Sequence, residues 1–192
     1  MMNRIAIVSF VLMSMITSTR GIKAVDKKTY QVVYDERLEQ PTKVAYFVEC
    51  SKGKFSRDGL EFYLEPGVHT SNNADYKNND WDKGHMAPAG SFSCNEENLN
   101  RTFSYVNCAL QHKLLNRGVW KNLETYEREL SIRERVNITI KIHFSKSSKV
   151  LKTGATIPDA FTKTIKRGKK TESFYFRNEA PKSSRIEDYL VR

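Results

Sequence analysis

His85 is the residue of this chain best suited to acid–base chemistry. It lies in the segment 81–90, directly after Asp82, Lys83 and Gly84. An imidazole titrates near neutral pH and can take a proton from water, and Lys83 places a cation beside it. Gly84 would let the backbone approach a ligand closely. Taken alone, this tetrapeptide is more often an ordinary charged turn, so a site needs a second group of residues.

A second polar group lies on a predicted helix downstream. From Gln111 onward, apolar residues recur at helical spacing: Leu115, Val119, Leu123, Tyr126 and Leu130. Asn116, Glu124 and Arg128 form a ridge beside this stripe, and the amide oxygen of Asn116 is a hard, neutral ligand that suits Mg²⁺. The simpler interpretation is a solvated helix face with an ion pair four residues apart. Without the upstream histidine, that interpretation would be preferred.

Together the two groups supply what phosphodiester hydrolysis requires. The reaction needs an activated water in line with the leaving oxygen, and positive charge where the phosphate accumulates negative charge. Mg²⁺ keeps several waters and takes few protein ligands. A site with one amide ligand and a nearby carboxylate is therefore chemically reasonable, although it would hold the metal weakly.

The order and spacing of these residues resemble the DNA/RNA non-specific endonucleases, a family that includes secreted bacterial nucleases and mitochondrial endonuclease G. The resemblance runs from about Tyr30 to the end of the chain. It rests on Asp82-Lys83-Gly84-His85-Met86-Ala87-Pro88-Ala89, then Thr102-Phe103, Asn107 and Gln111, then Asn116-x-Gly118-x-Trp120-x-x-Leu123-Glu124-x-x-x-Arg128, with Ile157-Pro158 ahead of Phe161-Thr162-Lys163.

The resemblance implies a role for each motif position. His85 would activate water, Asn116 would be the sole direct protein ligand of Mg²⁺, and Glu124 would hold a metal-bound water. Lys83 and Arg128 would contact the scissile phosphate. Mn²⁺ would be a substitute metal, and the products would carry 5′-phosphate ends. The implied fold is α+β, of the beta-beta-alpha-metal (His-Me finger) type, with a mainly antiparallel central sheet and flanking helices.

Other positions follow the family less closely. Arg57 would be a third phosphate-binding cation, and Asp82 would be structural. Lys83 stands where the family usually has arginine, and offers a mobile point charge in place of a planar fork. Residues 108–110 replace a serine–proline-like stretch, and Gly90 stands where aspartate is common. These departures keep open the alternative of a catalytically weakened or inactive secreted nucleic-acid-binding protein of the same fold.

The periodicity predicts the elements that must position these residues. Strands are expected over residues 44–50, 102–110 and 136–144, a loop over 70–80, and a short closing helix near 186–190. The basic run 163–170 either follows the substrate backbone or is a solvated hairpin, and we favour the solvated hairpin.

Composition favours a polyanionic partner. The 192 residues carry a formal net charge of +10, which falls to about +8 without residues 1–20. Excess positive charge drives sequence-independent binding to nucleic acid through counterion release. Heparin-like glycans, anionic membranes or solubility explain other basic proteins equally well, as would a basic extracellular ligand or toxin that acts on a protein or glycan.

The N-terminus has the pattern of a secretory signal. Arg4 precedes an apolar run over residues 5–16, which is too short to span a membrane comfortably. We expect a signal peptide over residues 1–20, with cleavage between 18 and 24, and a single nuclease domain over 21–192. A mitochondrial presequence fits this uniformly apolar segment less well, and an uncleaved anchor is the other alternative. No stable membrane association is expected after cleavage.

Export would give the three cysteines a role. Cys50, Cys94 and Cys108 permit one disulfide and one free thiol. The short separation of Cys94 and Cys108 makes that pair a marginal choice, and Cys50 with either partner stays open. No close Cys or His spacing predicts a zinc site.

The sequence as a whole predicts a secreted, Mg²⁺-dependent, sugar-non-specific endonuclease. It would bind DNA and RNA through backbone phosphates, because the candidate contacts are cations and no base-reading element is evident. A homodimer is compatible with the sequence.

Overall fold

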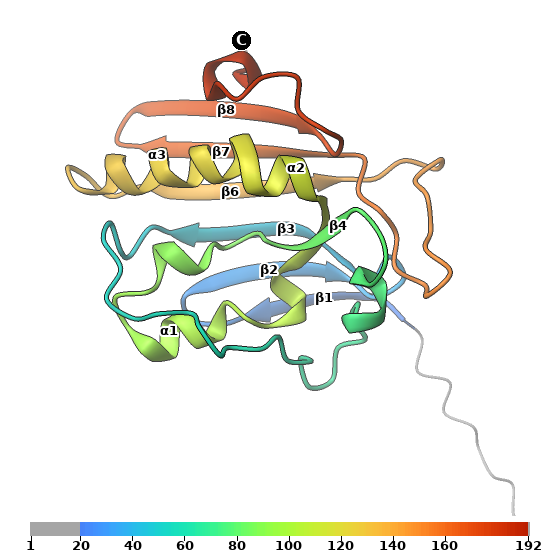
Figure 1. The fold of residues 1–192 in the computed structure, drawn as a ribbon. Helices are drawn as coiled ribbons and strands as arrows, with labels where there is room; N and C mark the ends of the chain where they lie inside the picture. The colour runs from blue at the N-terminus through green and yellow to red at the C-terminus, as the bar shows by residue number, and fades with distance from the viewer. Residues whose placement is uncertain (1–19, 192) are drawn as a thin grey trace, which may run out of the picture.

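A six-stranded antiparallel sheet forms the centre of the computed structural model, which describes residues 20–191 (Figure 1). The strand order is β1-β2-β3-β6-β7-β8. The strands are β1 Ile22–Asp26, β2 Tyr30–Asp35, β3 Gln40–Phe47, β6 Asn137–His143, β7 Ala160–Arg167 and β8 Lys170–Arg177. Apart from Arg20, the predicted signal peptide lies outside the described residues.

The long connection between β3 and β6 carries the remaining elements of the site. They are η1 Asn73–Tyr76, β4 Trp81–His85, η2 Ala89–Ser91, α1 Glu96–Arg101, η3 Tyr105–Asn107, β5 Cys108–His112, α2 Lys113–Leu115, η4 Asn116–Trp120 and α3 Lys121–Ser131. β4 and β5 pair as an antiparallel ribbon, and the chain continues directly into the helix. This is the predicted strand, strand and helix order, and the chain is α+β as expected.

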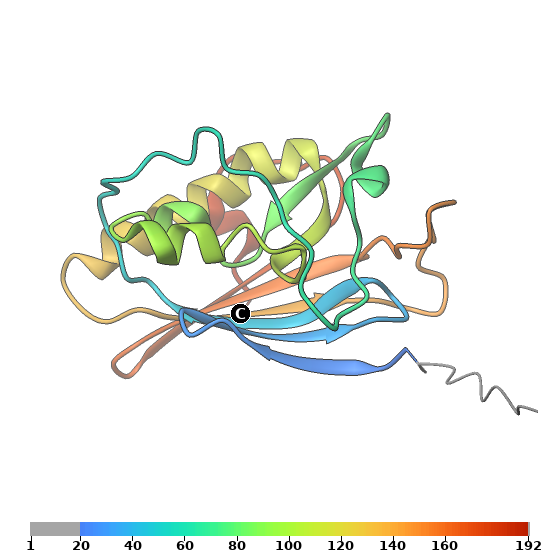
Figure 2. The ribbon, with the colours of Figure 1, turned by 90° about the horizontal axis from the view of Figure 1, so that it is seen from below.

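All the helices in the described part of the chain lie on one face of the central sheet, as Figure 2 shows from below. Inward-facing side chains of β6 and β7, among them Ile138, Ile140 and Phe161, are buried under them. The alternation predicted for residues 136–144 is therefore confirmed. No helix within residues 20–191 is both long enough and apolar enough to cross a membrane.

The predicted amphipathic helix is present but kinked. It begins at Lys113 and is interrupted at Gly118, where the backbone leaves helical geometry. Leu115 and Leu123 on its inner face are buried, and the Trp120 ring packs 5.5 Å from the ring of Phe161. This packing fixes the rotation of the helix about its axis, and hence the direction of its polar ridge.

Two predicted strands have different bounds. β3 ends at Phe47, because the amides of Glu49 and Cys50 leave the sheet and donate to the carbonyl oxygen of Ser91. β5 begins only at Cys108, because residues 102–107 form a turn and η3. The closing helix is present as η5, Ile186–Tyr189.

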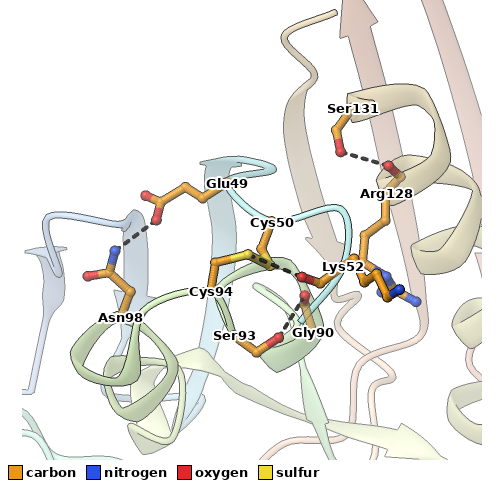
Figure 3. Close-up of a disulfide and its surroundings, with 9 residues drawn as sticks. All are labelled: Glu49, Cys50, Lys52, Gly90, Ser93, Cys94, Asn98, Arg128 and Ser131. Carbon is orange, nitrogen blue, oxygen red and sulfur yellow. Dashed lines mark hydrogen bonds between the residues drawn. A yellow bond between two sulfur atoms is a disulfide. The ribbon is translucent and has the colours of Figure 1, made fainter. Parts of the chain in front are cut away.

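The disulfide joins Cys50 to Cys94, so the marginal choice of Cys94 with Cys108 is wrong (Figure 3). Cys108 is a free, buried thiol in β5, where it pairs across the ribbon with His85. The disulfide reinforces backbone hydrogen bonds from Lys54 and Phe55 to the carbonyl oxygen of Ser93, each 2.9 Å long. Together they hold the segment after β3 against the turn after η2.

Candidate functional site

One pocket of about 1150 Å³ collects all the predicted site residues. It lies between β4, the helix after β5 and the segment 53–62. The predicted residues that line it are Arg57, Lys83, His85, Asn116, Glu124 and Arg128. Residues separated by up to 71 positions in the sequence therefore converge on one place.

His85 ends β4 with its imidazole held between two aromatic rings. The ring centroids of Phe62 and Phe103 lie 4.8 Å and 4.9 Å from that of His85. Its buried Nε2 has no hydrogen-bond partner among residues 20–191. Burial and the nearby charge of Arg57 lower the pKa of His85 to about 3. The ring is therefore neutral at pH 7, which is the form that can accept a proton.

The backbone on either side of His85 is fixed by neighbouring polar side chains. Asn107 accepts a hydrogen bond from the Ala87 amide at 2.8 Å and donates one to the Ala87 carbonyl at 2.9 Å. At Gly84, an added Cβ would lie 2.4 Å from Oε1 of Gln111. Gly84 therefore makes room for a side chain of the neighbouring strand, not for a ligand as its position suggested.

Asn116 is oriented by a carboxylate on the neighbouring strand. Its Nδ2 donates to Oδ2 of Asp82 at 2.9 Å, and Arg117 grips the same carboxylate through two bonds of 2.8 Å and 2.6 Å. Although burial acts against it, hydrogen bonding to Arg117 and Asn116 lowers the pKa of Asp82. With Nδ2 committed, the Asn116 Oδ1 is the atom left for a ligand. Asp82 thus orients Asn116, beyond the structural role expected for it.

Glu124 lines the pocket close to a fully buried ion pair. Nζ of Lys163 lies 2.8 Å from Oε1 of Glu127, and both side chains are 0% exposed. The Tyr46 hydroxyl donates to the other carboxylate oxygen of Glu127 at 2.7 Å. Burial raises the pKa of Glu124 to about 7, even though the charge of Lys163 acts to lower it. The interpretation of residues 163–170 as a solvated hairpin is therefore wrong for Lys163.

Lys83 is held in place, in contrast to the mobile point charge expected from its type. Its Nζ donates to Oδ1 of Asn73. It also lies 5.2 Å, 5.5 Å and 6.0 Å from the ring centroids of Phe62, Tyr105 and Tyr76. Phe62 contacts both this ammonium group and the His85 ring. Neither Phe62 nor Asn73 carried a sequence signal, because Phe62 reaches the site from an irregular segment and Asn73 reaches it from the short helix η1.

Arg128 and Arg57 border the pocket near the segments that the disulfide joins. The Arg128 guanidinium lies beside Gly90, where an added Cβ would be 3.2 Å from Nη1 (Figure 3). Gly90, which departs from the family pattern, therefore leaves room for it. Arg57 follows the segment held by Cys50 and Cys94, and makes no ion pair within residues 20–191.

The residues fit a weakly held, hard divalent cation. No group of three or more His, Cys, Asp or Glu side chains in the described part of the chain could hold a metal. The amide oxygen of Asn116 and the carboxylate of Glu124 do line the same pocket. One neutral oxygen and a nearby carboxylate suit Mg²⁺, which retains much of its water shell.

Known proteins share this sequence pattern and fold. The DNA/RNA non-specific endonuclease family matches residues 10–192. The mitochondrial nuclease EXOG of Danio rerio is 35% identical over 103 residues, which cover 51% of this chain and 30% of that protein. The mitochondrial endonuclease G of Bos taurus is 32% identical over 110 residues, which cover 55% and 37%. The matched part thus spans about a third of these relatives.

A solved structure shows the same fold. The crystal structure of an EndoG/EndoGI complex aligns with a TM-score of 0.78 at 23% identity, over 88% of this chain and 80% of that chain. The fold is therefore the predicted beta-beta-alpha-metal type.

The expected secreted localisation is wrong. The EXOG and endonuclease G relatives are named as mitochondrial nucleases. The apolar run over residues 5–16, on which secretion was predicted, lies outside the described residues.

Proposed function

The chain belongs to the DNA/RNA non-specific endonuclease family, and on that premise we propose that residues 21–192 act as one nuclease domain. It would hydrolyse phosphodiester bonds of DNA and RNA with the help of Mg²⁺, or Mn²⁺ in its place. The observation that carries the proposal is the convergence of His85, Asn116 and Glu124 with three cations on one pocket.

His85 is the group that takes the proton from the attacking water. It is neutral at pH 7 because its pKa is lowered to about 3. The rings of Phe62 and Phe103 restrict its rotation. The two hydrogen bonds between the Asn107 side chain and the Ala87 backbone fix the chain next to it. A base held in this way needs little reorganisation during the reaction.

Asn116 and Glu124 would hold the metal, Asn116 directly and Glu124 through water. A bound divalent cation would supply positive charge to the phosphate oxygens. Asp82 keeps the Asn116 amide oriented through the Nδ2 bond of 2.9 Å. Because Arg117 also binds Asp82, the carboxylate stays ionised and the amide oxygen stays available.

The cations would bind the substrate backbone. Arg57 and Arg128 border the pocket, and Lys83 supplies fixed charge in its wall. Phosphate contacts carry no sequence information, so cleavage with low sequence and sugar preference follows. The net charge of +10 supports binding to a polyanion.

The test is cleavage of plasmid DNA and of RNA with Mg²⁺, and then with chelator. We expect His85→Ala to lower turnover by about 10²- to 10⁴-fold, the usual contribution of a general base. Asn116→Ala should lower it nearly as far through lost metal. Matched controls are His69→Gln and Asn122→Ala, which lie outside the pocket. If both site variants cut as the parent does, the assignment is wrong.

A second outcome would select the alternative function. If the parent cleaves neither substrate but binds both in a salt-sensitive manner, the protein is a nucleic-acid-binding relative without catalysis. The caged ammonium of Lys83, in the position where the family usually has arginine, is the feature that would account for such a loss.

A further inference from the structure

The face of the central sheet opposite the helices carries no covering layer among residues 20–191 (Figure 2). Its side chains are those that alternate with the buried ones along β3, β6, β7 and β8. They include Lys43, Thr139, Lys141, Thr162, Thr164 and Tyr175, and we call this surface the outer face. The cleavage pocket lies on the helix side, so the proposed function gives the outer face no task.

The lysines of the outer face lack negative partners. Lys43 and Lys141 are directly opposite each other in the β3–β6 ladder, and both are exposed. Neither forms an ion pair within residues 20–191, and the outward positions of these four strands carry no carboxylate. Like charges in opposite positions destabilise a sheet. A bound anion would remove that cost.

The rest of the outer face suits a nucleic-acid strand. Thr139, Thr162 and Thr164 line a groove of about 620 Å³ together with the two lysines. Tyr175 is paired with Thr162 in register and is 45% exposed. Hydroxyl groups and ammonium groups bind phosphates, and an exposed aromatic ring on an open sheet can stack on an unpaired base.

We propose that the outer face is a second nucleic-acid site, which binds single-stranded nucleic acid apart from the cleavage pocket. It rests on the proposed function only in that the substrate class is nucleic acid. Stacking on Tyr175 requires unpaired bases, so a single strand fits this face better than a duplex.

Charge also argues against a second copy of this chain as the occupant. A twofold interface must be complementary to itself. Packing two outer faces together would bring the Lys43 and Lys141 side chains of both copies close to one another, and the outward positions of β3, β6, β7 and β8 carry no carboxylate to pair with them. Such an arrangement is repulsive, whereas a phosphate backbone is complementary.

The first experiment measures binding without turnover, using His85→Ala protein, chelator and an oligothymidylate of about 20 nucleotides. Lys43→Gln/Lys141→Gln should weaken binding about tenfold. It should also lower the slope of log affinity against log salt by about 1.4, from two phosphate contacts on a single strand. The matched control Lys152→Gln/Lys182→Gln removes the same charge from exposed positions elsewhere and should leave the slope unchanged.

A pocket variant separates the two sites. Arg57→Gln/Arg128→Gln should remove a different part of the binding, additive with the loss from the outer-face variant. If the pocket variant alone abolishes binding of the oligothymidylate, the outer-face proposal is overturned. Because no cleavage is measured, this result is independent of the cleavage test of the proposed function.

The second experiment locates the strand by lysine acetylation and mass spectrometry. Oligothymidylate should protect Lys43 and Lys141 and leave Lys152 and Lys182 reactive. Equal reactivity with and without the oligonucleotide would overturn the proposal. So would protection by anionic phosphatidylserine vesicles but not by the oligonucleotide, or protection that arises with protein concentration alone, which would indicate a second copy.

Discussion

Lys163 and Lys166 lie three residues apart on β7 and face opposite sides of the sheet. Lys163 points under the helices, where it pairs with Glu127 at 2.8 Å and is 0% exposed. Lys166 points to the other side, is exposed, and makes no ion pair within residues 20–191. The same residue type is therefore a structural element of the core on one face and a free surface cation on the other.

The difference extends to the faces as wholes. On the helix side, charged groups that shape the site have fixed partners: Asp82 pairs with Arg117, and Lys163 pairs with Glu127. On the outer face, Lys43 and Lys141 have none in the described part of the chain. Fixed charges suit a site that must hold its geometry during a reaction. Unpartnered charges suit a surface that exchanges counterions for a polyanion.

The largest expected effect comes from breaking the buried ion pair. Lys163→Met should lower the free energy of unfolding by about 3 to 5 kcal/mol, because it leaves the Glu127 carboxylate buried without its partner. Lys166→Met, on the other face, should change it by no more than about 0.5 kcal/mol. Urea denaturation of the two variants measures both values.

A double variant tests the reason for that loss. Lys163→Met/Glu127→Leu removes both charges and should recover much of the stability that Lys163→Met loses, since apolar residues often replace a buried pair at little cost. Equal stability of the Lys163→Met and Lys166→Met proteins would remove the distinction between the two faces.

Local sequence patterns predicted the strands and helix faces that depend on the spacing of apolar and polar residues. The alternation over residues 136–144 identified β6, and the spacing of Asn116, Glu124 and Arg128 placed three side chains on one helix face that does line the pocket. The basic run 163–170 failed as a pattern, because strand alternation sends Lys163 inward and Lys166 outward. Charge density along the chain does not show which side of a strand each residue faces.

Contacts between distant segments could not be predicted from one sequence. Cys50 and Cys94 meet only because the chain after β3 returns to the turn after η2. Phe62 and Asn73 reach Lys83 from a long connection without regular periodicity. Arg117 adjoins Asn116, but its partner Asp82 lies on a strand 35 positions earlier. Each contact depends on tertiary packing, which has no local signature.

A smaller effect is expected where a fixed charge acts through a neighbour. If the proposed function holds, Asp82→Asn should raise the Mg²⁺ concentration for half-maximal cleavage about 10- to 100-fold, as loss of a group behind a metal ligand usually does. An amide has one neutral acceptor oxygen in place of the two charged oxygens that Asn116 and Arg117 now share, so it would hold the Asn116 Nδ2 less firmly. Cleavage rates measured across a Mg²⁺ titration give this value.

Arg117→Gln is the matched control for that prediction. It removes the other partner of Asp82 but keeps the bond from Asp82 to Asn116. The Arg117 side chain is 69% exposed, and exposed ion pairs contribute little, so the metal dependence should shift less than about fivefold. Equal shifts in the two variants would mean that Asp82 does not act by orienting Asn116.

The smallest expected effect concerns Glu124, which is on the helix side but outside the Lys163–Glu127 pair. Burial raises its pKa from 4.5 to about 7, so the folded protein binds more protons than the unfolded chain between these values. Stability therefore falls as pH rises through this window and is level above it. In chelator, Glu124→Gln should therefore stabilise the protein at pH 8 and should have no effect at pH 4. We expect a gain of only about 1 kcal/mol at pH 8, because the Glu124 side chain is half-buried and water screens part of the effect. The same variant should lose cleavage activity, so the carboxylate would be kept at a cost to stability. Urea denaturation at both pH values measures the difference in the free energy of unfolding. An effect of Glu124→Gln that does not depend on pH would show instead that Glu124 is as well partnered as Asp82 and Lys163.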